Sequence, residues 1–149
     1  MPLSQKCQYA VRAVFELAKR ESQGPVRIAD IAEAQAIPMR FLQGILNSLR
    51  GSGIVDSTRG KKGGYILLKP ATRLTVGEVI EFFEGSLAPV DCLTNPNESC
   101  PLKGRCVFSS LWLRAQRAVE EVYDGTTFKN LVEEDAKLQE EGGRCDYMI

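Results

Sequence analysis

The sequence predicts a mainly α-helical fold with a small β-wing, in which a winged helix-turn-helix is followed by a long dimerisation helix. Three features lead to this prediction. Two stretches with helical spacing of apolar residues flank Ala36-Ile37-Pro38, two short β-prone stretches follow around a glycine-rich turn, and residues 107–124 form one long amphipathic stretch. Two helices joined by a tight turn and followed by a hairpin are typical of proteins that place the second helix in the major groove of DNA.

Residues 4–21 are the first predicted helix, because their apolar side chains recur at helical spacing. This apolar stripe consists of Cys7, Ala10, Val11, Val14, Leu17 and Ala18. The segment Gln23-Gly24-Pro25 ends the helix. The next helix begins near Arg27, whose side chain has no acceptor for a capping hydrogen bond. We therefore expect a weakly capped start, which Asp30 partly offsets through the helix dipole.

The helix-turn-helix spans residues 28–50. Ile28, Ile31 and Ala32 share one face of its first helix. Pro38 is tolerated in the first turn of the second helix, because its missing N–H would have no partner there. The second helix has an apolar face of Phe41, Leu42, Ile45, Leu46 and Leu49, and it ends at Gly51 and Gly53.

The predicted wing is a hairpin of two strands, residues 54–57 and 65–68. Its tip carries three cations among three glycines, in the order Arg59, Gly60, Lys61, Lys62, Gly63 and Gly64. Cations beside bare backbone suit a close approach to phosphate. We therefore assign the hairpin tip to the DNA interface.

After the wing, Thr75-Val76-Gly77-Glu78 matches a capping box, and Gly85 ends the helix that it starts. We divide the chain into a DNA-binding domain (1–85), a cysteine-bearing sensor loop (86–106), and a dimerisation helix with a C-terminal segment (107–149). The long helix is expected to pack against the same helix of a second subunit, because so small a chain has little core to cover it. The alternative is packing on the chain's own first helix.

Composition is that of a globular protein, with 149 residues and 44% apolar residues. There is no apolar run of about 18 residues and no signal-peptide core, so we expect a cytoplasmic protein without a membrane span. The net charge of zero hides an asymmetry. Residues 1–75 hold 12 Lys and Arg against 5 Asp and Glu (+7), and residues 76–149 hold 7 against 14 (−7). The basic half contains the winged helix, as expected of a DNA-binding protein.

Five cysteines in a cytoplasmic protein indicate metal or redox chemistry rather than structural disulfides. Cys92, Cys100 and Cys106 are separated by seven and then five residues, without the close pair usual in zinc sites. The chain has no histidine, which excludes histidine ligands and catalysis by Ser-His-Asp or Cys-His arrangements. No acid–base pair, phosphate loop or activated nucleophile is found, so we do not expect an enzyme. The wide spacing is compatible with an iron–sulfur cluster.

The chain resembles the winged-helix regulators typified by the IscR, NsrR and RirA repressors, over nearly its whole length. The resemblance rests on the motifs Lys6-x-x-Tyr9-Ala10, Ile37-Pro38-x-x-Phe41-Leu42-x-x-Ile45-Leu46-x-x-Leu49 and Arg59-Gly60-x-x-Gly63-Gly64-Tyr65. A three-cysteine loop before a long helix is similar to the cluster-binding branch of this family. The seven-residue gap between the first two cysteines is closer to the RirA-like members.

The resemblance implies a homodimeric repressor that binds palindromic double-stranded promoter DNA. It implies one iron–sulfur cluster per subunit, 2Fe–2S or 4Fe–4S, held by Cys92, Cys100 and Cys106 and sensing iron, redox state or nitric oxide. Pro38, Arg40, Phe41 and Gln43 would lie in the major groove. Arg59 would enter the minor groove from the wing, and Lys6 and Tyr9 would contact phosphates.

The fourth cluster ligand stays open. Ser109 stands where IscR-like members have a histidine, and Cys7 and Gln8 stand where NsrR-like members have an acid. Cys7 is therefore either a ligand contributed across the dimer or a small buried apolar residue, and Cys145 is the weaker candidate. The alternative function is a cluster-free regulator whose cysteines react directly with oxidants.

Overall fold

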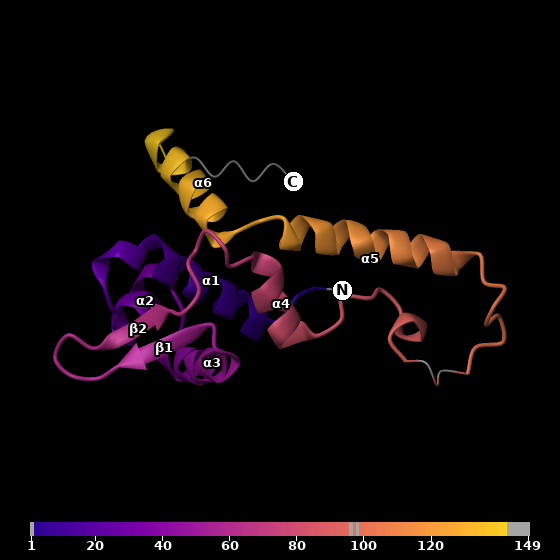
Figure 1. The fold of residues 1–149 in the computed structure, drawn as a ribbon, viewed down its shortest axis with the longest axis horizontal. Helices are drawn as coiled ribbons and strands as arrows, with labels where there is room; N and C mark the ends of the chain where they lie inside the picture. The colour runs from indigo at the N-terminus through magenta and orange to yellow at the C-terminus, as the bar shows by residue number, and fades with distance from the viewer. Residues whose placement is uncertain (1, 96, 98, 143–149) are drawn as a thin grey trace.

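The computed structural model describes residues 2–142 except 96 and 98 (Figure 1). It confirms a mainly helical fold with one small antiparallel sheet. The elements in order are α1 (Gln5–Lys19), η1 (Glu21–Gln23), α2 (Ile28–Gln35), α3 (Met39–Ser52), β1 (Val55–Thr58), β2 (Gly64–Leu67), α4 (Val76–Glu84), η2 (Asp91–Leu93), α5 (Phe108–Asp124) and α6 (Phe128–Glu140). No helix in the described part of the chain is long and apolar enough to cross a membrane.

The turn between α2 and α3 is stabilised by a backbone hydrogen bond and by the side chain of Arg12. Ala36 adopts the left-handed conformation (φ 51°), and the Ile37 N–H then donates to the Ala32 carbonyl at 3.0 Å. The Arg12 guanidinium of α1 donates to the carbonyls of Gln35 and Ala36. Left-handed backbone is strained for a residue with a Cβ. The hydrogen bonds from Arg12 stabilise the turn in this conformation and so stabilise the angle between α2 and α3.

The wing is tied to the segment before α2. β1 and β2 pair in register from Val55 opposite Leu67 to Thr58 opposite Gly64. Val26 forms an antiparallel β-bridge with Tyr65 of β2: the Val26 N–H donates to the Tyr65 carbonyl at 3.0 Å, and the Tyr65 N–H donates to the Val26 carbonyl at 2.8 Å. We call this bridge the Val26 rung. A Cβ at Gly64 would lie 2.4 Å from the Val26 carbonyl oxygen, so the close approach of Val26 to β2 requires glycine at this position.

The hydrophobic core of the described residues lies inside the winged-helix domain, around α1. Its largest fully buried side chains include Leu17, Ile31, Leu42, Leu46, Leu49, Leu74, Ile80 and Phe128. Phe128 belongs to α6, which returns to α1 and forms an ion pair between Lys19 Nζ and Asp135 at 3.0 Å. α6 therefore packs on α1 of the winged helix.

α5 leaves the winged helix at a narrow junction with α4 and projects away from it (Figure 1). The expected capping box at the start of α4 is present, with the Glu78 N–H donating to Thr75 Oγ1 and the Thr75 N–H donating to Glu78 Oε2. A Cβ at Gly77 would lie 3.1 Å from the Asp124 backbone nitrogen and closer still to its carboxylate. The glycine therefore lets the end of α5 approach the first turn of α4.

Candidate functional site

A hollow between α1 and α3 collects four residues that the sequence assigned to DNA: Lys6, Tyr9, Arg40 and Phe41. Its centre is aromatic, because the rings of Tyr9 and Phe41 stack with centroids 6.2 Å apart and planes inclined by 30°. The Arg40 guanidinium lies 4.7 Å from the centroid of the Phe41 ring. The ring quadrupole attracts this cation, so the stack holds Arg40 at the flank of α3.

Residues of α1 form the other wall of this hollow. Gln5 Nε2 donates to Tyr9 Oη at 3.0 Å, and the Arg12 guanidinium lies 5.3 Å from the Tyr9 ring centroid. Lys6 extends toward α4, with Nζ 5.7 Å from the Phe83 ring centroid. These contacts hold the Tyr9 ring against α3, while Lys6 stays exposed.

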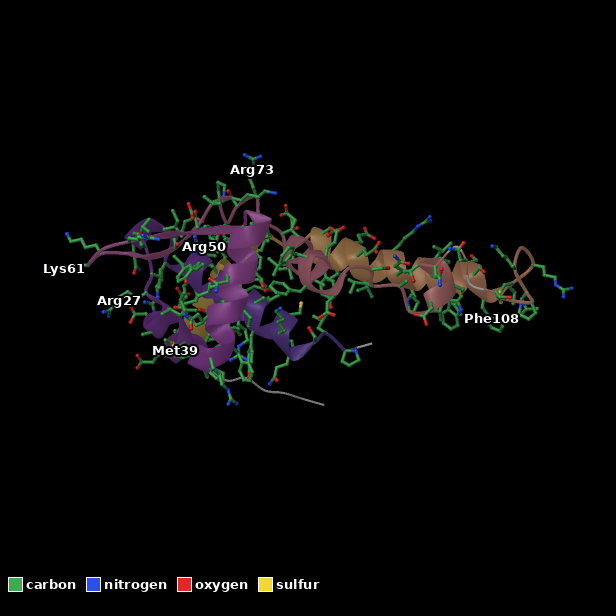
Figure 2. The ribbon with its side chains drawn as sticks, turned by 90° about the horizontal axis from the view of Figure 1, so that it is seen from below. Arg27, Met39, Arg50, Lys61, Arg73 and Phe108 are labelled. Atoms are coloured by element: carbon green, nitrogen blue, oxygen red, sulfur yellow. The ribbon has the colours of Figure 1, made fainter. Side chains whose placement is uncertain are left out.

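Pro38, which precedes α3, and Gln43 on α3 are both exposed and lie outside the hollow. Pro38 is the N-cap, and its carbonyl accepts the N–H groups of Phe41 and Leu42 at 3.0 and 3.1 Å. Figure 2 shows α3 along its length, with Met39 and Arg50 near its two ends. The opposite side of this helix is buried in the core through Leu42, Ile45, Leu46 and Leu49.

The wing tip presents its cations to solvent. Arg59, Gly60, Lys61 and Lys62 are all exposed, and Lys61 points outward from the end of the hairpin (Figure 2). Gly60 has a φ of 103°, a conformation that favours glycine. A Cβ at Gly63 would lie 2.4 Å from the Thr58 carbonyl oxygen, so the turn also needs glycine there.

Sequence reasoning missed Arg27 as a neighbour of the wing. Arg27, Lys61 and Lys62 line one hollow beside the N-terminus of α2. Arg27 also forms an ion pair with Asp30, Nε to Oδ2 at 3.2 Å. No spacing rule connects residues more than 30 positions apart, and the contact arises only because the Val26 rung carries the wing beside α2.

The three loop cysteines are only partly brought together. Cys92 and Cys100 line one hollow in the loop between α4 and α5, and Cys106, two residues before α5, does not line it. Cys92 is exposed, and the other two are half-buried. Within the described ranges, no three Cys, His, Asp or Glu side chains converge in an arrangement that could hold a metal ion.

The surroundings of Cys106 make its thiol more acidic than an ordinary cysteine. Hydrogen bonds from the Ser109 side chain and from the Phe108 N–H lower the pKa of the Cys106 thiol below its ordinary value. Both donors belong to the first turn of α5, where backbone N–H groups have no helical partner. A thiolate is the form that binds metals and attacks electrophiles, so this position favours both kinds of chemistry.

Cys7 lies in the opposite environment. It is fully buried in α1, and burial together with the nearby Glu84 carboxylate raises the pKa of its thiol to about 12. A neutral, buried thiol suits the apolar alternative for Cys7 better than the ligand alternative. Cys145, the other candidate for a fourth ligand, lies outside the described residues.

Comparison with known proteins identifies related chains. The profile of the family Rrf2, described as "Iron-dependent Transcriptional regulator", matches residues 3–134. The regulator CymR of Bacillus subtilis is 34% identical over 131 residues, covering 88% of this chain and 89% of that protein. The regulator IscR of Pectobacterium atrosepticum is 36% identical over 132 residues, covering 89% of this chain and 79% of that protein.

Solved structures give the same two relatives. "T. potens IscR" superimposes with a TM-score of 0.76 at 32% identity, over 93% of this chain and 91% of that one. CymR, "the Global Cysteine Regulator of B. subtilis", gives 0.76 at 31% identity, over 90% and 98%. The oxidised form of Staphylococcus aureus CymR gives 0.71 at 34% identity, over 89% and 97%. The similarity therefore covers the loop and α5 as well as the winged helix.

Proposed function

Because the chain belongs to the Rrf2 family of transcriptional regulators, we propose that it represses transcription from palindromic promoters and releases them according to the state of an iron–sulfur cluster. Members of the family bind DNA, and the matched relatives are named as regulators rather than enzymes. The comparisons support a winged-helix transcriptional regulator. The cluster, the repression and the operator symmetry are parts of our proposal.

The proposed DNA interface consists of α3, the wing and the start of α1. It would use Lys6, Tyr9, Pro38, Arg40, Phe41, Gln43, Arg59, Gly60, Lys61 and Lys62. Support comes from their placement, since α3 and the hairpin tip both project exposed cations, as phosphate binding requires.

We propose a homodimer assembled through α5. This helix has no buried residue, and its apolar stripe includes Leu111, Val119 and Val122, the last of them 64% exposed. The alternative of packing on α1 is not supported, because α6 covers α1 in the fold while α5 projects away (Figure 1). An uncovered stripe of this length is unfavourable in water, and a second copy would bury it.

The observation that carries the cluster proposal is the placement of three thiols in one loop between α4 and α5, two of them lining one hollow. Thiolates are the ligands of iron–sulfur clusters, so Cys92, Cys100 and Cys106 fit in kind. A bound cluster would supply a link among these thiolates that is sensitive to iron and oxidants. The three thiols would have to converge on the cluster. This ordering is how the loop would signal to α4 and α5.

A second candidate is direct thiol sensing without a cluster. The lowered pKa of Cys106 favours it, since thiolates react with oxidants and disulfides, and one solved relative is an oxidised form of CymR.

Purification under anaerobic conditions, followed by iron and sulfide analysis, separates the two candidates. The cluster proposal predicts a brown protein with stoichiometric iron and sulfide, and loss of colour in Cys92→Ala, Cys100→Ala and Cys106→Ala. A colourless wild-type protein whose DNA binding responds to peroxide alone would favour thiol sensing. Cys7→Ala decides between the two roles left open for Cys7: loss of the cluster would make it the fourth ligand, and an intact cluster would make it a buried apolar residue.

A further inference from the structure

Two polar side chains of α1 reach the end of α2. Arg12 and Glu16 lie one helical turn apart, so they share one face of α1. The Arg12 guanidinium donates to the backbone carbonyls of Gln35, the last residue of α2, and of Ala36. Glu16 Oε2 accepts a hydrogen bond from Gln35 Nε2 at 2.9 Å. α1 therefore holds both the backbone and the side chain of Gln35.

The stability of the core does not explain the burial of Glu16. It is the one buried charged side chain among the described residues, at 3% exposure, and burying a carboxylate is unfavourable unless it is paired. Its other oxygen, Oε1, accepts a hydrogen bond from Arg20 Nε at 2.8 Å. Replacing a buried ion pair with apolar side chains is often neutral or stabilising. What Glu16 provides beyond stability is a fixed position for Gln35.

The turn that follows Gln35 needs support from outside α2. Ala36 has a φ of 51° and is the one described residue other than glycine with a positive φ, a strained conformation. Its N–H donates to the Glu33 carbonyl at 3.4 Å, which is long for a hydrogen bond. The last carbonyls of a helix lack a helical donor, and a cation is favourable there. Arg12 supplies both the donor and the charge.

Arg12 also connects this turn to α3. Its guanidinium lies 5.3 Å from the centroid of the Tyr9 ring. Tyr9 in turn stacks on Phe41, in the first turn of α3, with the ring centroids 6.2 Å apart. One side chain of α1 therefore contacts the end of α2 and the ring that packs against α3, so the relative placement of these two helices depends on α1.

We propose that Arg12 and Glu16 are positioning residues for DNA binding: they fix the turn between α2 and α3 before DNA arrives and make no contact with DNA. Glu16 is buried, and the Arg12 guanidinium is already bonded to two carbonyls. Without them the turn would populate other conformations, and the apparent DNA affinity would fall with the population of the competent one. The proposal rests on the DNA-binding function given above.

Glu16→Leu in the full-length, anaerobically purified protein is the main test, because the two explanations predict opposite signs. Loss of a carboxylate makes the DNA-binding half more positive, so electrostatics alone would strengthen binding. Positioning predicts weaker binding to a duplex that the wild-type protein selects from a random library, by roughly tenfold if the competent turn falls to a tenth of the population. The unfolding temperature should be unchanged or higher. Glu33→Gln, which neutralises an exposed carboxylate of α2, is the control and should not weaken binding.

Arg12→Lys tests whether Arg12 positions the turn or binds phosphate. Lysine keeps the charge but lacks the planar fork that bonds two acceptors and stacks on a ring. Positioning predicts severalfold weaker binding with an unchanged slope of log affinity against log salt. A phosphate contact would leave the affinity of Arg12→Lys near the wild-type value, and Arg12→Met would reduce the slope by about one unit.

Amide hydrogen exchange in the free protein reports on the turn itself. The Ile37 N–H donates to the Ala32 carbonyl across the turn at 3.0 Å. It should exchange roughly fivefold faster or more in Glu16→Leu and Arg12→Lys, because local opening becomes easier. The Leu46 N–H, in the middle of α3, should exchange at the wild-type rate.

Three outcomes would overturn the proposal. Equal or tighter DNA binding by folded Glu16→Leu protein would show that Glu16 does not position the turn, and unchanged exchange at Ile37 in both variants would show the same for α1. If Glu16→Leu does not fold, Arg12→Lys decides alone, through its affinity and salt slope. If the wild-type protein selects no duplex, the DNA-binding function itself fails, and exchange at Ile37 still shows whether α1 holds the turn.

Discussion

Ser4 Oγ donates a hydrogen bond to Glu84 Oε1 at 2.6 Å, and the Ser4 N–H donates to the same oxygen at 2.7 Å. These bonds lower the pKa of the Glu84 carboxyl and join the N-cap of α1 to the last residue of α4, where the cysteine loop begins. Farther along α1, Tyr9 stacks on Phe41 of α3. A continuous set of contacts therefore runs from the start of the loop to the helix proposed to read DNA.

Glu84→Ala should weaken the coupling between the loop and α3, because it removes the acceptor of both Ser4 bonds. The ratio of DNA affinities with and without the cluster, expected at 5- to 150-fold in the wild type, should move toward one. Titrations of both forms with labelled operator would measure it. Glu81→Ala, one turn earlier on the exposed side of α4, is the control. An unchanged ratio in Glu84→Ala would show that the signal takes another route.

The wing should contribute to DNA binding in two distinct ways. Arg59→Ala should weaken binding to the specific operator by about 1–3 kcal/mol, if its guanidinium enters the minor groove. Lys61→Ala and Lys62→Ala should each reduce the slope of log affinity against log salt by about one unit, because each removes one phosphate contact. Titrations at several salt concentrations distinguish the two effects. Unchanged affinity in all three variants would exclude the wing from the interface.

Val122→Glu should dissociate the dimer, because it would bury an unpaired carboxylate in the proposed α5 interface. The loss in free energy of dimerisation should be large enough to give monomers at micromolar concentration in analytical ultracentrifugation. Arg117→Glu places a carboxylate on the polar side of the same helix and should remain dimeric. A dimeric Val122→Glu protein would contradict assembly through α5.

The Cys106 thiol should react faster than an ordinary cysteine in reduced, metal-free protein. Its lowered pKa means that its thiolate fraction at neutral pH exceeds that of an ordinary cysteine, whose pKa is near 9.0, and falls as the pH is lowered through its own pKa. Ser109→Ala should raise this pKa and slow iodoacetamide labelling at pH 7 severalfold, as measured by mass spectrometry. Fully buried Cys7 should be labelled only after unfolding. Equal rates for Cys106 in both proteins would contradict the hydrogen-bond assignment.

Local signals in the sequence were enough to predict much of the fold. The winged helix-turn-helix and the mainly helical class are confirmed, as are the capping box at Thr75, the uncapped start of α2 at Arg27 and the end of α5 at Asp124. Each depends on neighbouring residues or on helical periodicity. Contacts between distant segments were not predictable in this way. The Val26–Tyr65 rung and the return of Phe128 to the core both join segments with no shared spacing.

For the candidate site too, local features were predictable from the sequence, and contacts between distant segments were not. The exposed cations of the wing and of α3 were recognisable from composition and family resemblance, and their roles on DNA stay predictions. The stack of Tyr9 on Phe41 and the bonds from Ser4 to Glu84 depend on how α1 crosses α3 and α4, which the sequence pattern does not specify. The three cysteines were identified as a group, but the structure joins only Cys92 and Cys100 in one hollow.

The most direct test of cluster control is operator affinity, measured anaerobically on the same preparation before and after chelation of iron. Under cluster control the two affinities are expected to differ by roughly 5- to 150-fold. The Cys92→Ala, Cys100→Ala and Cys106→Ala dimers are expected to bind with the affinity of the chelated protein, whether or not iron and sulfide are supplied. Cys145→Ala should behave as the wild type. Equal affinities for the intact, chelated and variant proteins would contradict control of DNA binding by the cysteine loop.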